Sequence, residues 1–287
     1  MKPMKSFEVI PVVKSRCAKM SRHYNNLLEE FDVEEIHQFR LNVKKLNAFL
    51  HLLNAGRTTT KKINLPKNLH AFYSAVGELR NLQLHGEHVQ RLSKQLNLAT
   101  PINYLQVLVQ RQNEIKSDIR TLALQRSLHT SCYKLIASAP EKVTTQAIEN
   151  FVSESKRRLM KILLAESYTD ESLHCLRKIL KDFLYLWSWL DTETTSLPNS
   201  AGMDKGVCIV LSERLGDFQN FCIMLQFFDR FLSNRHPTTV EVIVLSALRQ
   251  HVQGEKKGLK IKLSVEMQDC VQKKLDNDVL PPNYQYQ

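Results

Sequence analysis

The chain has 287 residues, of which 43% are apolar, and its 40 lysines and arginines against 29 aspartates and glutamates give a formal net charge of +11. An apolar content this high excludes an intrinsically disordered chain, and the small numbers of glycines and prolines, 8 and 9, argue against a protein built from many short strands. The positive charge predicts an anionic partner, such as nucleic acid, anionic lipid or a phosphate polymer, whose binding weakens as salt rises.

The first two predicted helices occupy the stretch that ends at Gly56. The first spans about Val9 to Glu30. Asp32, followed by Glu35 three positions later, has the pattern of a capping box and predicts the start of the second helix. The apolar residues of that helix recur at spacings of three and four, which predicts one buried face; they are Ile36, Phe39, Val43, Leu46, Leu50 and Leu53. Gly56 predicts its end.

Two more helices are predicted before the middle of the chain. A polar loop leads to Pro66, which suits the first position of a helix because its φ is already helical. The apolar period continues to about Leu96. Thr100–Pro101 then opens a fourth helix, which we expect to run without interruption to about Ser138. Pro140 marks the break between the two halves of the chain.

The second half predicts the same order of elements. A helix over residues 145–165 is followed by a helix that Thr169 or Asp170 caps. The apolar face of this second helix again has spacings of three and four; its residues are Leu173, Leu176, Leu180, Leu184 and Trp187. A loop over residues 192–204 leads to a third helix over residues 206–232.

The last predicted helix begins after a second capping box, which Thr238 and Glu241 form. We expect this helix to be interrupted between Gly254 and Gly258, because glycine weakens a helix interior, and to end near Lys274. Residues 276–287 are predicted to be an irregular tail.

No targeting or membrane segment is predicted. Glu8 and Pro11 interrupt the only apolar run near the N-terminus, so that run is not a secretion signal. No apolar stretch approaches the length of a membrane span. The six cysteines contain no Cys-x-x-Cys pair, and we expect them to be reduced, small buried side chains. These features together predict a cytoplasmic protein.

The two halves also resemble each other in sequence. His37-Gln-Phe-Arg40-Leu-Asn-Val-Lys44 aligns with His174-Cys-Leu-Arg177-Lys-Ile-Leu-Lys181. Gly77-Glu-Leu-Arg-Asn aligns with Gly216-Asp-Phe-Gln-Asn, and Arg111-Gln aligns with Arg249-Gln. All three matches share an offset of about 138 residues, a period that predicts two domain-sized copies. We place the N-terminal repeat at residues 8–139 and the C-terminal repeat at residues 142–274.

The repeated motif places basic side chains on one face of each helix. Positions i, i+3 and i+7 of a helix lie on the same side, so His37, Arg40 and Lys44 point one way. The same spacing holds for their counterparts in the second half, and each basic stripe runs beside the apolar stripe. Neighbouring like charges destabilise a helix, so their presence in both copies indicates a binding site. Arginine and lysine bind phosphate oxygens, and a neutral histidine adds a donor. The pattern therefore predicts a cradle for a polyanion.

Further basic residues stand close to these stripes in sequence or in matched positions. Each of them taken singly suits a solvent-exposed charge, and together they are candidates for the edge of the same site. They are Lys45, Arg80, Arg111, Lys178, Arg249 and Lys256.

Two alternatives use the same residues. Glu34 to His37 and Glu171 to His174 are both Glu-x-x-His, the motif that di-metal helical bundles take from two of their helices, with Glu78 and Glu213 as the extra pair. The basic side chains on the histidine face would compete with the metal ions for those carboxylates, which argues against this hypothesis. The second alternative, a non-specific nucleic-acid binder, rests on net charge alone.

The motifs resemble those of the conserved histidine α-helical domain family, CHAD. Its members carry H-x-x-R-x-x-x-[RK]-[RK]-x-R near the start and L-H-x-L-R-K-x-x-K-x-x-R-Y in the second half. The first pattern is similar to the stretch from His37 to Asn47, and the second is similar to the stretch from Leu173 to Tyr185. Asn47 and Leu184 stand where the patterns have arginine.

The resemblance implies an all-α fold of two four-helix-bundle-like repeats, related by pseudo-twofold symmetry, with a basic groove between them. It implies non-catalytic binding of inorganic polyphosphate or a similar phosphate polyanion, free or in granules, with no cofactor and no metal. Nucleic acid is not expected as a specific ligand, and no membrane is expected as a partner. By position, the implied ligand-binding residues are His37, Arg40, Lys44, Lys45, His174, Arg177, Lys178, Lys181 and Tyr185.

Overall fold

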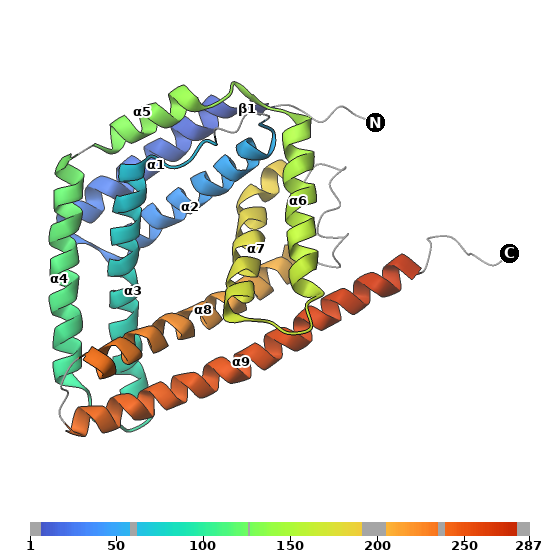
Figure 1. The fold of residues 1–287 in the computed structure, drawn as a ribbon. Helices are drawn as coiled ribbons and strands as arrows, with labels where there is room; N and C mark the ends of the chain where they lie inside the picture. Colours follow the sequence, from blue (N-terminus) through green and yellow to red (C-terminus); the bar gives the residue numbers. More distant parts are fainter. Residues whose placement is uncertain (1–6, 58–61, 126, 191–204, 235–238, 280–287) are drawn as a thin grey trace. The chain divides into compact units, whose positions relative to one another are not determined.

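The computed structural model describes residues 7–57, 62–125, 127–190, 205–234 and 239–279, and almost all of them are helical (Figure 1). The helices are α1 Val9–Glu30, α2 Val33–Ala55, α3 Lys67–Gln95, α4 Ile102–Gln125, α5 Leu128–Ser138, α6 Thr145–Leu163, α7 Asp170–Leu190, α8 Lys205–Asn234 and α9 Thr239–Val279. Two short strands, β1 Phe7–Glu8 and β2 Lys142–Val143, pair antiparallel. The all-α prediction is confirmed, although the sequence did not predict the strand pair.

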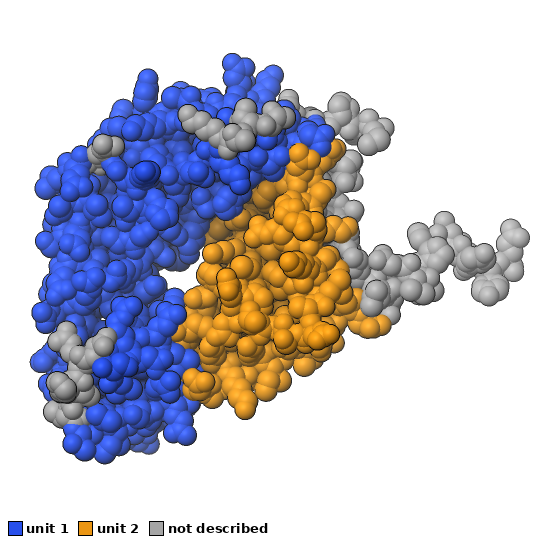
Figure 2. Space-filling model, viewed as in Figure 1, with its two compact units in different colours: residues 1–147, 223–252 blue, residues 148–222, 253–287 orange. Residues whose placement is uncertain are grey.

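The chain divides into two compact units (Figure 2). The first unit comprises residues 1–147 and 223–252, and the second comprises residues 148–222 and 253–287. The chain therefore passes from one unit to the other three times, near the start of α6, within α8 and within α9. The boundaries of the two sequence repeats stay a prediction.

The first unit is built by packing of neighbouring helices. Helix α1 packs against α2 and α5, and α3 packs against α2 and α4. The apolar stripe predicted for α2 is buried throughout, with no side chain more than 3% exposed. Tyr24, Phe39 and Phe72 of α1, α2 and α3 form an aromatic cluster, with centroid distances of 4.7 Å from Tyr24 to Phe72 and 5.4 Å from Phe39 to Phe72. Such contacts fix how these three helices pack.

The start of α2 is determined by the residue predicted to cap it. The Asp32 carboxylate accepts hydrogen bonds from the backbone N–H groups of Glu34 and Glu35, at 2.8 and 3.0 Å. These bonds are the largest cause of the lowered pKa of Asp32. The Glu35 side chain was expected to complete the capping box, but it lies 2.7 Å from Nδ1 of His23 in α1. Helix α2 therefore begins at the predicted place, and Glu35 links it to α1.

A buried polar pair lies where α3, α4 and the end of α8 meet in the first unit. His85 is 2% exposed and Tyr104 is 1% exposed, and the His85 Nε2 atom lies 2.6 Å from the Tyr104 hydroxyl. The His85 ring stacks on Phe227 at a centroid distance of 4.8 Å. The buried Glu241 carboxylate accepts a hydrogen bond from the Tyr104 backbone N–H at 3.0 Å, and so caps α4 from α9. Thr238, the other member of the predicted capping box, lies outside the described residues.

The second unit has a core between α6 and α7. Phe151 of α6 packs edge-on against Phe183 of α7, with ring centroids 5.8 Å apart. In the predicted apolar stripe of α7, Leu173, Leu176 and Leu180 are buried, whereas the other two residues are half-buried. The loop predicted over residues 192–204 lies outside the described residues.

Three predictions about the extent of the helices are wrong. The single helix expected from Pro101 to Ser138 is two helices, α4 and α5, and the Ser127 side chain caps α5 by accepting a hydrogen bond from the Thr130 backbone N–H at 3.3 Å. In contrast, α9 continues through Gly254 and Gly258 without interruption and extends to Val279, so the first residues of the predicted irregular tail are helical. Each glycine costs about 1 kcal/mol relative to alanine, which a 41-residue helix with a buried side tolerates.

The expectation of six free thiols is also wrong. Cys17 of α1 and Cys132 of α5 form a disulfide across a sequence separation of 115 residues. Within the part of the chain that the structure describes, the other four cysteines are in no disulfide. No signal in the sequence indicated this pair, because its members lie far apart and in no recognised spacing.

Candidate functional site

The basic face of the first unit is formed by α2 and α3. His37 is exposed, and Arg40 and Lys44 are half-buried on the same side of α2. Burial is the largest cause of the lowered pKa of His37, Glu34 opposes it, and the positive charges of Arg80, Lys44 and Arg40 lower the pKa further. His37 is therefore neutral near pH 7. The predicted residues Arg40, Lys44 and Arg80 surround it, and an added anion would meet several donors.

Arg40 is held in place by α3. Its Nη1 donates a hydrogen bond to the Tyr73 backbone carbonyl at 3.3 Å, and its guanidinium lies over the Tyr73 ring, 4.9 Å from the centroid. The same group lies directly on Gly77, where a Cβ atom would be 2.1 Å from Nη1. Burial lowers the pKa of Arg40, which still remains charged. The glycine of the repeated motif thus makes room for the arginine of the repeated motif.

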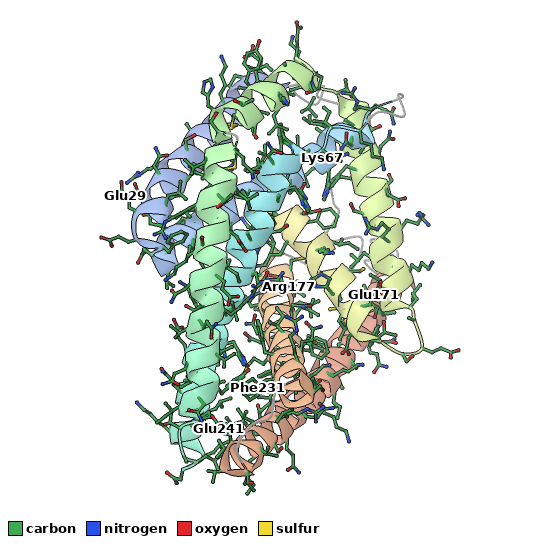
Figure 3. All side chains as sticks on the ribbon, turned by 60° about the vertical axis from the view of Figure 1, so that its left-hand side comes forward. Glu29, Lys67, Glu171, Arg177, Phe231 and Glu241 are labelled. Atoms are coloured by element: carbon green, nitrogen blue, oxygen red, sulfur yellow. A yellow bond between two sulfur atoms is a disulfide. The ribbon has the colours of Figure 1, made fainter. Side chains whose placement is uncertain are left out.

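The second unit repeats this arrangement on α7 and α8. Arg177 of α7 lies over Gly216 of α8, with Nε and Nη2 at 3.6 and 3.7 Å from the position of a Cβ atom (Figure 3 labels Arg177). Burial is the largest cause of the lowered pKa of His174. Lys178 and then Arg177 lower this pKa further, and a hydrogen bond between His174 and the Gln219 side chain opposes them. The pKa of Lys181 is lowered by burial and then by Arg177, with Glu213 opposing.

Some buried polar atoms on these two faces have no hydrogen-bond partner among the described residues. They are Nη1 of Arg80, Nε of Arg177 and Nδ1 of His174, all buried and without a hydrogen bond there. A buried polar atom without a partner is costly, and in native structures it commonly marks a ligand or water position. We call the two clusters the α2 face (His37, Arg40, Lys44, Arg80) and the α7 face (His174, Arg177, Lys178, Lys181).

Three of the predicted edge residues are neutralised by carboxylates. Arg111 forms ion pairs of 3.0 Å with both Glu78 and Glu114. Arg249 pairs with Asp229 at 2.6 Å. Lys256 pairs with Asp170, the first residue of α7. Their charges are compensated, so these three contribute less to an anion site than the residues of the two faces.

The remaining predicted residues have other surroundings. Burial is the largest cause of the lowered pKa of Lys45, and the charges of Arg16 and Lys19 on α1 lower it further. Lys45 therefore belongs to a separate basic group. Tyr185 is half-buried and Lys178 is exposed on α7. The sequence did not predict that Tyr73 contacts Arg40, that Gln219 bonds to His174 or that Glu213 lies near Lys181. These neighbours lie on the next helix, and such contacts depend on packing.

The di-metal alternative gains no support from these surroundings. No group of three or more histidine, cysteine, aspartate or glutamate side chains within the described ranges is placed to hold a metal ion. Glu78, proposed as an extra ligand, is paired with Arg111. Glu171 is exposed in the first turn of α7 (labelled in Figure 3), where an acidic residue interacts favourably with the helix dipole.

Among the described helices, none has the length and apolar content needed to cross a membrane.

Comparison with known proteins gave a family match and structural matches. The family model of the CHAD domain matches residues 12–229. The chain is similar in structure to PptA from Streptomyces chartreusis, with 13% identity, a TM-score of 0.63, and coverage of 91% of this chain and 96% of that chain. It is also similar to the CHAD domain from the plant Ricinus communis, with 12% identity, a TM-score of 0.67, and coverage of 92% and 90%. No curated protein matches the chain.

Proposed function

Since the chain belongs to the CHAD family, we propose that it binds inorganic polyphosphate on the α2 face and the α7 face, without catalysing a reaction. Polyphosphate is a linear polymer with about one negative charge on each phosphate, so a ligand site for it needs several donors in a row. Arginine, lysine and neutral histidine at helical spacing supply such a row.

The matched geometry of the two faces carries the proposal. In each unit the arginine of the repeated motif lies over the glycine of the next helix, Arg40 on Gly77 and Arg177 on Gly216. Burial, together with neighbouring positive charge, lowers the pKa of the histidine in both. A solvent-exposed basic face has no physical reason to repeat an arginine packed on a glycine and a neutral histidine. A common anionic ligand supplies one. It remains a prediction that one polymer chain occupies a groove lined by both faces.

The chemistry of the faces favours a phosphate polymer over nucleic acid. Sequence-independent binding of single strands uses aromatic side chains on which bases stack, combined with basic grooves. The nearest aromatic ring on the α2 face, Tyr73, is covered by the Arg40 guanidinium. The donors that remain suit phosphate oxygens, which polyphosphate presents without bases.

The test is a calorimetric titration of long-chain polyphosphate into the full chain. The Lys178→Ala/Lys181→Ala variant removes two cations of the α7 face and leaves Arg177 packed on Gly216. The control variant Arg158→Ala/Lys161→Ala removes two exposed cations at the same spacing from α6 of the same unit. We expect affinity to fall about tenfold or more in the first variant, since hydrogen bonds to charged groups contribute about 1.5 kcal/mol or more each.

The control variant and a competition experiment with nucleic acid distinguish binding at the α7 face from binding by net charge. The α6 variant should bind nearly as well as the original chain, since long-range attraction alone is screened at physiological salt. Equal loss in both variants would mean that net charge, and not the α7 face, binds the polymer. DNA or RNA at equal phosphate concentration should compete weakly. Full competition would favour the nucleic-acid hypothesis instead.

A further inference from the structure

A polar pocket of about 310 Å³ lies in the first unit between the start of α3 and helix α5. None of the residues of the α2 face lines it. Its walls include Asn64, Lys67 and Asn68 from the start of α3 and the segment before it, and Thr130, Ser131 and Lys134 from α5. The volume is at the lower end of the range of about 300–1,000 Å³ typical of ligand pockets, so it suits a small ligand.

The α3 N-terminus supplies backbone donors to this pocket. The residue at the N-cap position is Pro66, and no side chain caps the helix. Proline has no side-chain oxygen to accept a hydrogen bond, so the first N–H groups of a 29-residue helix keep their donor capacity and their share of the helix dipole. Such an end attracts an anion. An aspartate, serine or threonine at the same position would have satisfied these groups.

Two lysines give the pocket a positive charge. Lys67, in the first turn of α3 (labelled in Figure 3), and Lys134 of α5 are exposed and line it. Neither forms an ion pair with any residue that the structure describes. The described lining contains no aspartate or glutamate. The charges are therefore uncompensated, unlike those of Arg111, Arg249 and Lys256.

The hydroxyl of a largely buried serine points to a ligand in the pocket independently of the helix end. Ser131 is 5% exposed and lines the pocket, yet within the described part of the chain its hydroxyl forms no hydrogen bond. Its oxygen is not among the fully buried polar atoms, so a group in the pocket can reach it. An oxygen-rich anion in the pocket would accept its proton. The wall that carries Ser131 is fixed to α1, because the next residue, Cys132, is in the disulfide with Cys17.

We propose that this pocket binds a small phosphate anion, either inorganic phosphate or pyrophosphate. The backbone N–H groups at the start of α3, the ammonium groups of Lys67 and Lys134, and the Ser131 hydroxyl donate to the phosphate oxygens. This donor set matches a compact anion with several acceptor oxygens. The site is separate from the polyphosphate faces and does not depend on the function proposed for them.

The experiment follows backbone amide signals of the full chain by ¹⁵N–¹H NMR during titration with sodium phosphate at constant ionic strength. We expect saturable shifts for Asn68, Leu69 and Ser131. Lys67→Ala/Lys134→Ala should weaken binding about tenfold or more, because two charge-assisted contacts are lost. The control Lys94→Ala removes an exposed lysine from the last turn of α3 and should not change affinity. Ser131→Ala should weaken phosphate binding and leave the unfolding midpoint unchanged.

Several outcomes would overturn the proposal. These are the absence of saturable shifts with either phosphate or pyrophosphate, an equal effect of Lys94→Ala, and unchanged affinity in the Lys67→Ala/Lys134→Ala variant. The Lys178→Ala/Lys181→Ala variant should retain the phosphate-induced shifts. Loss of the shifts in that variant would place phosphate on the α7 face and contradict a separate pocket. A failure of polyphosphate binding at the two faces leaves this test intact.

Discussion

The two glycines of the repeated motif should respond with opposite sign when each is changed to alanine. At Gly77 a Cβ atom would lie 2.1 Å from Nη1 and 3.0 Å from Cζ of Arg40. The guanidinium would have to leave its place over Tyr73. At Gly216 the corresponding distances to Arg177 are 3.6 and 3.7 Å, which is ordinary van der Waals contact, so Arg177 stays in place.

The magnitudes follow from the contacts. Replacing glycine by alanine within a helix contributes about 1 kcal/mol of stability at either site. At Gly77 this gain is opposed by the loss of a hydrogen bond from a charged donor, about 1.5 kcal/mol for the long 3.3 Å bond to Tyr73, and of a cation–π contact of about 0.5–1 kcal/mol. Gly77→Ala should therefore destabilise by about 1 kcal/mol, and Gly216→Ala should stabilise by about 1 kcal/mol.

Urea unfolding of the two variants beside the original chain measures this difference. Because Arg40 is displaced, Gly77→Ala should also weaken polyphosphate binding, whereas Gly216→Ala should not. If Gly77→Ala stabilises the chain as much as Gly216→Ala does, the Arg40 guanidinium does not lie on Gly77, and the structural basis for matching the two faces is lost.

Two further predictions concern stability. Adding a reductant, or making the Cys17→Ser/Cys132→Ser variant, should lower the free energy of unfolding of the first unit. Chain entropy predicts a loss of up to about 4–5 kcal/mol for a loop of this length. Equal urea midpoints with and without reductant would show that the disulfide does not form. Burial lowers the pKa of His85 to about 3, so the unfolded state, with a pKa near 6.5, binds the proton first as pH falls. Stability should drop by about 2 kcal/mol between pH 7 and pH 5 from this group, and His85→Gln should flatten the dependence; an unchanged pH profile in that variant would refute the buried, neutral histidine.

The sequence predicted the helices well where local signals exist. The apolar period of α2, the Asp32 cap and the end at Gly56 are all visible in the structure, because periodicity and capping act over a few residues. The break between α4 and α5 has neither glycine nor proline to mark it. The two glycines of α9 suggested a break that did not occur, since helix propensity is a weak determinant beside tertiary packing.

In the candidate site, too, the sequence predicted what depends on local spacing and not what depends on packing between helices. The helical spacing predicted that His37, Arg40 and Lys44 share a face, and alignment of the halves paired Gly77 with Gly216. That each glycine lies beneath an arginine of the neighbouring helix depends on how two helices pack, so spacing alone did not reveal it. The pairing of Arg111 and Lys256 with carboxylates 33 and 86 residues away is likewise set by the tertiary structure.

The most direct test of the account asks whether the α2 face binds polyphosphate as the α7 face does. The measurement is the affinity for long-chain polyphosphate, by calorimetry at two salt concentrations, of Lys44→Ala/Arg80→Ala against the control Arg91→Ala/Lys94→Ala, whose two cations are exposed on α3. We expect a loss of about tenfold or more in the first variant, similar to that of Lys178→Ala/Lys181→Ala, and nearly unchanged binding in the control. Binding by the Lys44→Ala/Arg80→Ala variant that equals its control would contradict the claim that the duplicated faces serve one ligand.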